Sequence, residues 1–120
     1  MSKIKTEGPY TAEFLLTEAN GQRSRDSATI TGGQYAPGQV LGRKSSGEYA
    51  AHNPAASDGI QNAAAVLYGA VGAQDVDQLG TIMARDAEVI ASQLIWADNI
   101  TEAQKTTALS KLAEQGIIAR

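Results

Sequence analysis

Short strand-like segments separated by turn-forming residues occupy the middle of this 120-residue chain, and they constrain its fold more than any other feature. Glycine, proline, asparagine or aspartate stands between one segment and the next, and the segments are 27–31, 39–41, 48–50 and 64–68. Strands this short, with a turn about every 8–12 residues, are typical of a small barrel or clip rather than of a parallel sheet. The pattern therefore predicts a mainly β domain.

Residues 101–115 have the pattern of a helix. Thr101 and, three residues on, Gln104 can form a capping box at its start. Gly116 stands where a residue with positive φ often ends a helix. The apolar face of the predicted helix consists of Ala108, Leu109, Leu112 and Ala113. Ile117–Ile118 follow and are apolar enough to return to the core. The predicted fold class is thus α+β, mainly β with one C-terminal helix.

The segment between the strands and this helix is ambiguous. Thr81–Val89 is a strand candidate, and Ala87, Val89 and Ala91 alternate as in a strand. One helical face, however, collects Ala87, Ile90, Ala91, Leu94 and Ile95. Periodicity alone slightly favours a helix here.

The first 26 residues differ from the rest, because basic and acidic side chains alternate with breakers such as Gly8-Pro9 and Asn20-Gly21. We interpret 1–26 as an N-terminal arm and 27–120 as the compact domain. The arm carries one bulky apolar cluster, Phe14–Leu16. Such a cluster either folds back on its own core or docks on another chain.

Composition narrows the function classes. Hydrophobic residues make up 42% of the chain, enough for one domain with a modest core, and only 5% of the residues are aromatic. Association would stabilise so thin a core. The absence of cysteine excludes disulfides, cysteine–zinc sites and thiol catalysis. A net charge of −3 and a pI near 5.0 argue against a nucleic-acid partner.

No apolar run is long enough for a membrane span, and the start of the chain lacks the apolar core of a secretory signal. We therefore expect no membrane partner and synthesis in the cytosol without export.

The candidate chemical groups do not assemble into a site. His52 is the only histidine and is expected to face solvent in a loop. Asp75–Asp77 is typical of a polar turn, and Gly38–Ser45 lacks the spacing and the following helix of a phosphate-binding loop. We expect no catalytic residue, no metal and no cofactor. Trp96 is expected to plug the edge of the core, or else to form a subunit contact.

A set of short stretches stands in one order along the chain from about Thr11 onward: Glu13–Leu16, Asn20-Gly21, Ser24-Arg25, Gly38–Gly42, Gly47–Tyr49, Ser57–Gly59, Arg85–Val89 and Gly116–Ile118. In order and spacing they resemble the lambda-type head decoration proteins of tailed bacteriophages. The chain differs from the best-known member in the sequence of its arm and in a longer, alanine-rich C-terminal helix.

The resemblance implies a clip or incomplete-barrel domain whose homotrimers sit at local three-fold positions on the outer capsid surface of the virion. The N-terminal arms would order against the major capsid protein and cement neighbouring subunits. Tyr10, Phe14, Leu15 and Leu16 would then be the capsid-binding residues of the arm, and the protein would be made in the host bacterial cytoplasm. The resemblance also implies a strand, not a helix, over Arg85–Ala91.

Burial of Phe14–Leu16 would contribute about 1.5–3 kcal/mol per side chain, but ordering about ten residues of backbone costs about 1–2 kcal/mol each. The cluster alone cannot order the arm. Arm docking therefore requires main-chain pairing to an exposed strand edge and the avidity of three arms on one trimer. The alternative function is a small carbohydrate- or ligand-binding β module, which clustered exposed aromatic side chains would favour. A small enzyme has no support in the spacing.

Overall fold

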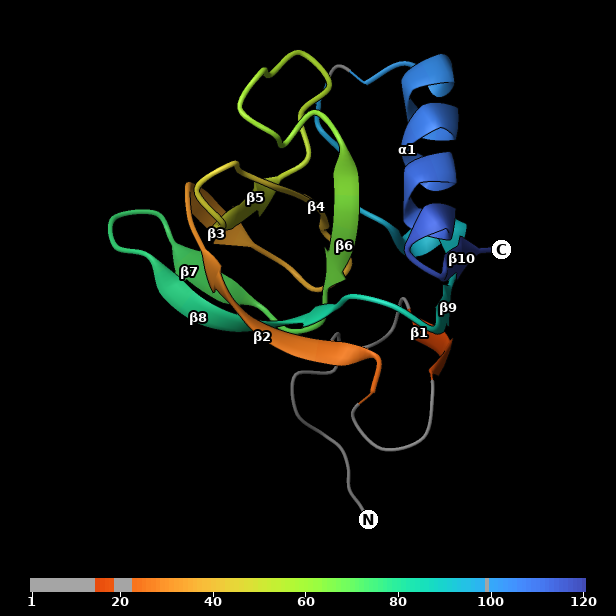
Figure 1. The fold of residues 1–120 in the computed structure, drawn as a ribbon, viewed down its shortest axis with the longest axis horizontal. Helices are drawn as coiled ribbons and strands as arrows, with labels where there is room; N and C mark the ends of the chain where they lie inside the picture. Colours follow the sequence, from red (N-terminus) through yellow and green to blue (C-terminus); the bar gives the residue numbers. More distant parts are fainter. Residues whose placement is uncertain (1–14, 19–22, 99) are drawn as a thin grey trace.

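The computed structural model describes residues 15–18, 23–98 and 100–120 of the chain (Figure 1). Tyr10 and Phe14 lie outside these residues. The elements within them are β1 (Leu15–Glu18), β2 (Arg25–Ile30), β3 (Gly33–Tyr35), β4 (Val40–Arg43), β5 (Tyr49–Ala51), β6 (Ala63–Leu67), β7 (Val71–Ala73), β8 (Gln78–Met83), β9 (Ala87–Val89), the 3-10 turn η2 (Ala91–Gln93), α1 (Glu102–Glu114) and β10 (Ile117–Ala119).

Five strands form a closed barrel in the order β2-β5-β4-β6-β8. The longest pairing joins β2 and β8, from Arg25 opposite Met83 to Ile30 opposite Gln78. Closure comes from a parallel contact between Ile30 of β2 and Tyr49 of β5. The mainly β fold class is therefore confirmed. The sequence predicted a clip or an incomplete barrel, and the observed barrel is closed.

One glycine allows a loop to pack closely against the barrel. Strand β4 passes so near the loop at Ile60 that a Cβ added to Gly42 would lie 2.6 Å from the carbonyl oxygen of Ile60. Backbone cannot move aside as a flexible side chain can, so this position requires glycine.

Apolar side chains pack in two clusters. The cluster inside the barrel contains Ile30, Leu41, Ala65, Leu67, Ala73 and Ile82. The other lies between the barrel, α1 and a small sheet, and contains Val40, Ala63, Val66, Met83, Ala87, Val89, Leu94, Ala108, Leu112 and Ile117. Helix α1 thus covers one side of the barrel and ties the small sheet to it.

The predicted C-terminal helix is confirmed as α1. The Thr101 side chain accepts a hydrogen bond from the Gln104 amide, and the Gln104 side chain accepts one from the Thr101 amide, which completes the capping box. Gly116 has φ +88°, as expected for the residue that turns the chain out of the helix. Ile117 then returns to the core, whereas Ile118 is exposed.

The periodicity-based helix near Ala87–Ile95 is wrong. The segment holds the short strand β9 and a single 3-10 turn, η2. Residues 84–86 separate β8 from β9, and Asp86 adopts φ 52° there, which breaks any regular element. The pairing of β9 with β1 and β10 stabilises a strand here more than the helical spacing of its apolar residues favours a helix. The strand implied by the resemblance is confirmed for Ala87–Val89.

The small sheet has the order β1-β9-β10, so strands from the two ends of the described chain flank β9. Strand β1 pairs antiparallel with β9, and β10 pairs parallel with it. Figure 1 shows this sheet beside the lower end of α1, while the loop that joins β7 to β8 projects at the opposite side of the barrel. Part of the expected 1–26 arm therefore pairs with the compact domain, and β2 begins at Arg25. The arm boundary at residue 26 stays a prediction.

Candidate functional site

A bulge in β1 gives the two leucines of the apolar cluster different surroundings. Leu15 lies opposite Val89 and Thr17 opposite Glu88, so Leu16 is an extra residue in the register. Leu15 packs against the larger core cluster, whereas Leu16 is 48% exposed. Leu15 thus anchors the start of the described chain, and Leu16 is available to a partner.

Strand β1 is clamped to the barrel by Glu18 and Arg25. The Arg25 guanidinium donates two hydrogen bonds to the Glu18 carboxylate, at 3.0 and 2.5 Å, and lies 4.1 Å from the centroid of the Tyr68 ring. Both charged side chains are largely buried, with 26% and 19% of their surfaces exposed. The bond to Glu18 raises the pKa of Arg25, against the opposing effect of burial. We call this set the Glu18–Arg25 clamp.

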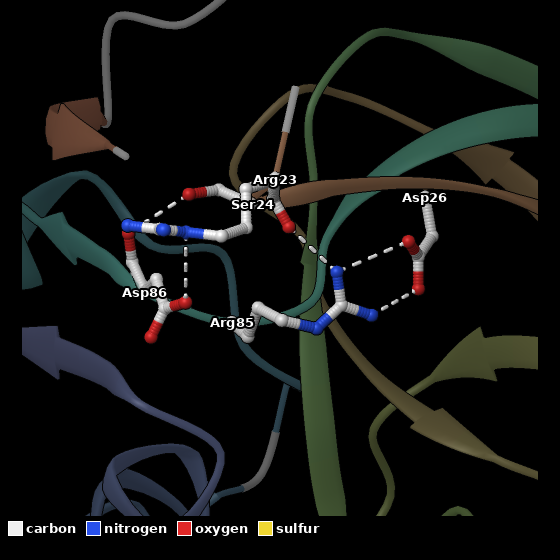
Figure 2. A network of polar contacts seen from close by, with 5 residues as sticks. All are labelled: Arg23, Ser24, Asp26, Arg85 and Asp86. Atoms are coloured by element: carbon white, nitrogen blue, oxygen red, sulfur yellow. Dashed lines mark hydrogen bonds and ion pairs between the residues drawn. The ribbon is translucent and has the colours of Figure 1, made fainter. Parts of the chain in front are cut away.

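A second polar network joins the start of β2 to the turn before β9 (Figure 2). The Arg85 guanidinium donates to both carboxylate oxygens of Asp26 and to the carbonyl oxygen of Arg23. Ser24, fully buried, donates from its hydroxyl to the carbonyl oxygen of Asp86, and Arg23 pairs with the Asp86 carboxylate at 3.5 Å. These contacts fix the path of the chain where it leaves the small sheet for the barrel.

The face of the small sheet that turns away from the core has Glu88 at its centre. Thr17 of β1 and Ile118 of β10 lie opposite Glu88 on either side. Glu88 accepts a hydrogen bond from Arg120 at 3.2 Å, and this bond, together with one from Thr17, lowers the pKa of Glu88. A shallow hollow of about 390 Å³ lies beside Ile118. We call this surface the outer sheet face.

The prediction that His52 faces solvent is wrong. His52 is 3% exposed, its Nε2 donates to the carbonyl oxygen of Gln61, and its ring meets Trp96 edge-on at 6.2 Å. Burial lowers the pKa of His52, and Nδ1 is buried with no hydrogen-bond partner among the described residues. The ring therefore serves as a neutral packing element.

Trp96 packs against the larger core cluster while staying partly exposed. This position agrees with the expected plug at the edge of the core. Its role in a subunit contact stays a prediction.

A hollow of about 570 Å³ opens beside His52, between the loop after β5 and the start of α1. Small apolar residues such as Ala51 and Pro54 line it, together with Tyr35 and a few rim charges. The carbohydrate-binding alternative needs several aromatic rings over a groove, and Tyr35 with His52 does not meet that requirement. Within the described residues there is no cluster of side chains that could hold a metal ion.

The Glu18–Arg25 clamp and the Arg85–Asp26 pair could not be predicted from the sequence, because the partners come from separate segments of the chain. For Arg85 and Asp26 the separation is 59 residues. The exposure of Ile118 was not predicted either, because Ile117 and Ile118 were both expected to return to the core. In the described part of the chain, no helix is long and apolar enough to cross a membrane.

A small closed barrel with a three-stranded sheet, β1-β9-β10, and one helix packed beside it defines a small, mainly β class of domain. The family described as bacteriophage lambda head decoration protein D matches residues 4–117, and the chain belongs to this family. It is a phage head decoration protein, a structural component of the virion capsid, and its family is not an enzyme class. No curated protein matches the chain significantly.

Proposed function

We propose that this decoration protein binds the expanded capsid as homotrimers and cements neighbouring capsid subunits through its N-terminal arms, with the major capsid protein as partner. Membership of the head decoration family supports a partner on the phage head. The observation that supports the arm mechanism is the geometry of β1. The strand is bulged, clamped by Glu18 and Arg25, and flanks β9, so residues before Leu15 start from a fixed point on the domain.

The packing of Leu15 changes the energy balance of the arm. Leu15 already contacts the domain core, so arm docking gains new apolar burial from Phe14 and Leu16 but little from Leu15. Two such side chains contribute about 3–6 kcal/mol, well below the cost of ordering about ten residues. Main-chain pairing to the capsid protein and three arms per trimer therefore supply the remainder.

The test is truncation of the arm at a point that leaves the fold intact. Removing residues 1–26 would delete β1, the buried Ser24 and Arg25, so the informative variant lacks residues 1–14 and keeps every described element. We expect this variant to fold, as judged by far-UV circular dichroism, and to lose binding to purified expanded capsids. The full chain is the matched control.

Phe14→Asp in the full chain should weaken capsid binding and leave the circular dichroism spectrum unchanged. Sedimentation of the free protein measures whether it is already a trimer in solution. Undiminished binding by the variant without residues 1–14 would refute the arm mechanism.

A further inference from the structure

His52 separates two hollows at the end of the molecule where α1 begins. The larger hollow, of about 570 Å³, opens beside the loop that follows β5, and Figure 1 shows this loop near the start of α1. The smaller hollow, of about 300 Å³, lies along α1 between Ala103 and Lys111. His52, Pro54 and Gln104 line both hollows. The buried ring of His52 is therefore part of a thin wall with space on either side.

The position of the ring suits its neutral form. Its Nε2 donates to the carbonyl oxygen of Gln61 at 3.1 Å, and its edge-on contact with Trp96 is apolar. The buried Nδ1 has no hydrogen-bond partner among the described residues. Protonation would place a second N–H donor and a positive charge at this nitrogen, and both are costly to bury without a partner. The buried position therefore disfavours the imidazolium.

The charges around the two hollows do not offset this cost while the ring stays buried. The titratable side chains that line the hollows with His52 are Tyr35, Lys44, Asp58, Asp98 and Lys111. Tyr35 is neutral near pH 7, and the two lysines oppose the two aspartates. Both aspartates, however, are exposed and border the larger hollow. A cationic ring inside that hollow would have water and two carboxylates around it.

The backbone next to the ring is held on both sides. The amide of His52 donates to the carbonyl oxygen of Val40 at 2.9 Å, and the amide of Asn53 donates to that of Ile60 at 3.0 Å. The loop therefore keeps its path when the ring moves. Rotation about the side-chain bonds of His52 is enough to carry the ring from the wall into the larger hollow.

We propose that His52 is a pH-dependent switch: when protonated, its ring leaves Trp96 and turns into the larger hollow, toward Asp58 and Asp98, while the barrel stays folded. Gln104 shares the wall with His52 and accepts the hydrogen bond from the Thr101 amide in the capping box. Departure of the ring therefore also loosens the first turn of α1. The inference goes beyond the proposed function and does not depend on capsid binding.

The experiment follows the fluorescence of Trp96, the only tryptophan, in the full-length protein between about pH 7.5 and 5. Its emission should change reversibly with a midpoint below 6.5, the ordinary pKa of histidine. The NMR titration of the His52 ring protons should have the same midpoint, and the far-UV circular dichroism spectrum should stay unchanged. His52→Gln is neutral, can still donate to the Gln61 carbonyl oxygen, and should abolish the change in emission.

Two carboxylate variants test where the ring goes. Asp58→Asn and Asp98→Asn should each lower the midpoint by a few tenths of a pH unit, because the cation in the hollow loses a counter-charge. The matched control is Asp75→Asn, which removes the same charge from a residue that lines neither hollow. The control should keep the midpoint of the unchanged protein.

Several outcomes would overturn the inference. Emission that stays constant in the folded protein, or that changes only together with circular dichroism, would mean that His52 takes up its proton only on unfolding. A change that persists in folded His52→Gln would assign it to another group. Equal midpoints in the Asp58, Asp98 and Asp75 variants would exclude the larger hollow as the destination of the ring. If His52→Gln does not fold, the ring titration and the carboxylate variants decide.

Discussion

The Glu18–Arg25 clamp should behave as a stabilising pair whose strength can be measured directly. Glu18→Gln removes the charge but keeps the shape of the side chain, and Arg25→Met keeps an unbranched stem near Tyr68 while removing the guanidinium. Each single change leaves the other partner partly buried without its counter-charge. The double change removes both charges together, so it should cost less than the sum of the two.

The geometry sets the size of this coupling. Hydrogen bonds to charged groups contribute about 1.5–3 kcal/mol. The contact of Arg25 with the Tyr68 ring is lost in both backgrounds and cancels from the coupling. Exposure of 26% of the arginine and 19% of the glutamate side chain lets solvent screen part of this attraction. We therefore expect a coupling free energy of about 1–2 kcal/mol between Glu18 and Arg25.

Urea unfolding of the four proteins in the double-mutant cycle measures the coupling. The matched control is the pair Glu102–Lys105 on α1, which is 3.6 Å apart with 91% of the glutamate side chain exposed. Its coupling should stay below about 0.5 kcal/mol. Hydrogen exchange at the amides of β1 should accelerate in the clamp variants and not in the control variants. A clamp coupling as small as that of the control pair would refute the reasoning.

Two further changes test the barrel and its buried histidine. Burial lowers the pKa of His52 below its ordinary value of 6.5, so the unfolded chain binds a proton more readily than the folded protein does. The free energy of unfolding should therefore fall as the pH drops below 6.5 and stay level above it. Urea midpoints between about pH 5 and 7.5 measure this, and His52→Gln should flatten the profile. Gly42→Ala should destabilise the protein by about 3 kcal/mol, because its Cβ would overlap the backbone of Ile60, and thermal unfolding checks this.

Both changes have internal controls. His52 is the only histidine, so no other side chain of ordinary pKa titrates in that window. A profile that stays level in the unchanged protein would contradict the account of His52. For Gly42 the control is Gly69→Ala, since nothing lies within 4 Å of a Cβ added at Gly69. Equal stability of the two alanine variants would show that β4 and the loop at Ile60 can separate without cost.

The sequence predicted those elements that are stabilised by contacts between residues close together in the chain. The capping box at Thr101 and the glycine at position 116 define α1 within one residue of its observed ends, because both act through neighbouring backbone groups. The turn residues between the central strands likewise predicted a small barrel or clip. The closing contact between Ile30 and Tyr49 carries no such signal, because it depends on the sheet curving as a whole.

Features that depend on distant partners could not be predicted in this way. His52 stands among alanine, asparagine and proline, and its burial comes from Trp96 and Gln61. The separation of Leu15 from Leu16 depends on a bulge against β9, and periodicity cannot locate a bulge from one strand alone. For the candidate site, the sequence indicated Leu16, but the clamp and Ile118 are defined by the pairing of strands.

The order of strands in the small sheet also sets a sequence of events in folding. Strand β9 needs residues 15–18 on one side and residues 117–119 on the other, so both of its pairings close long loops. The barrel can form from residues 25–83 before either pairing exists. During synthesis on the ribosome, the outer sheet face is therefore completed only after β10 has emerged. A nascent chain that stops before Ile117 would carry the strands of the barrel but would lack one of the two strands that flank β9.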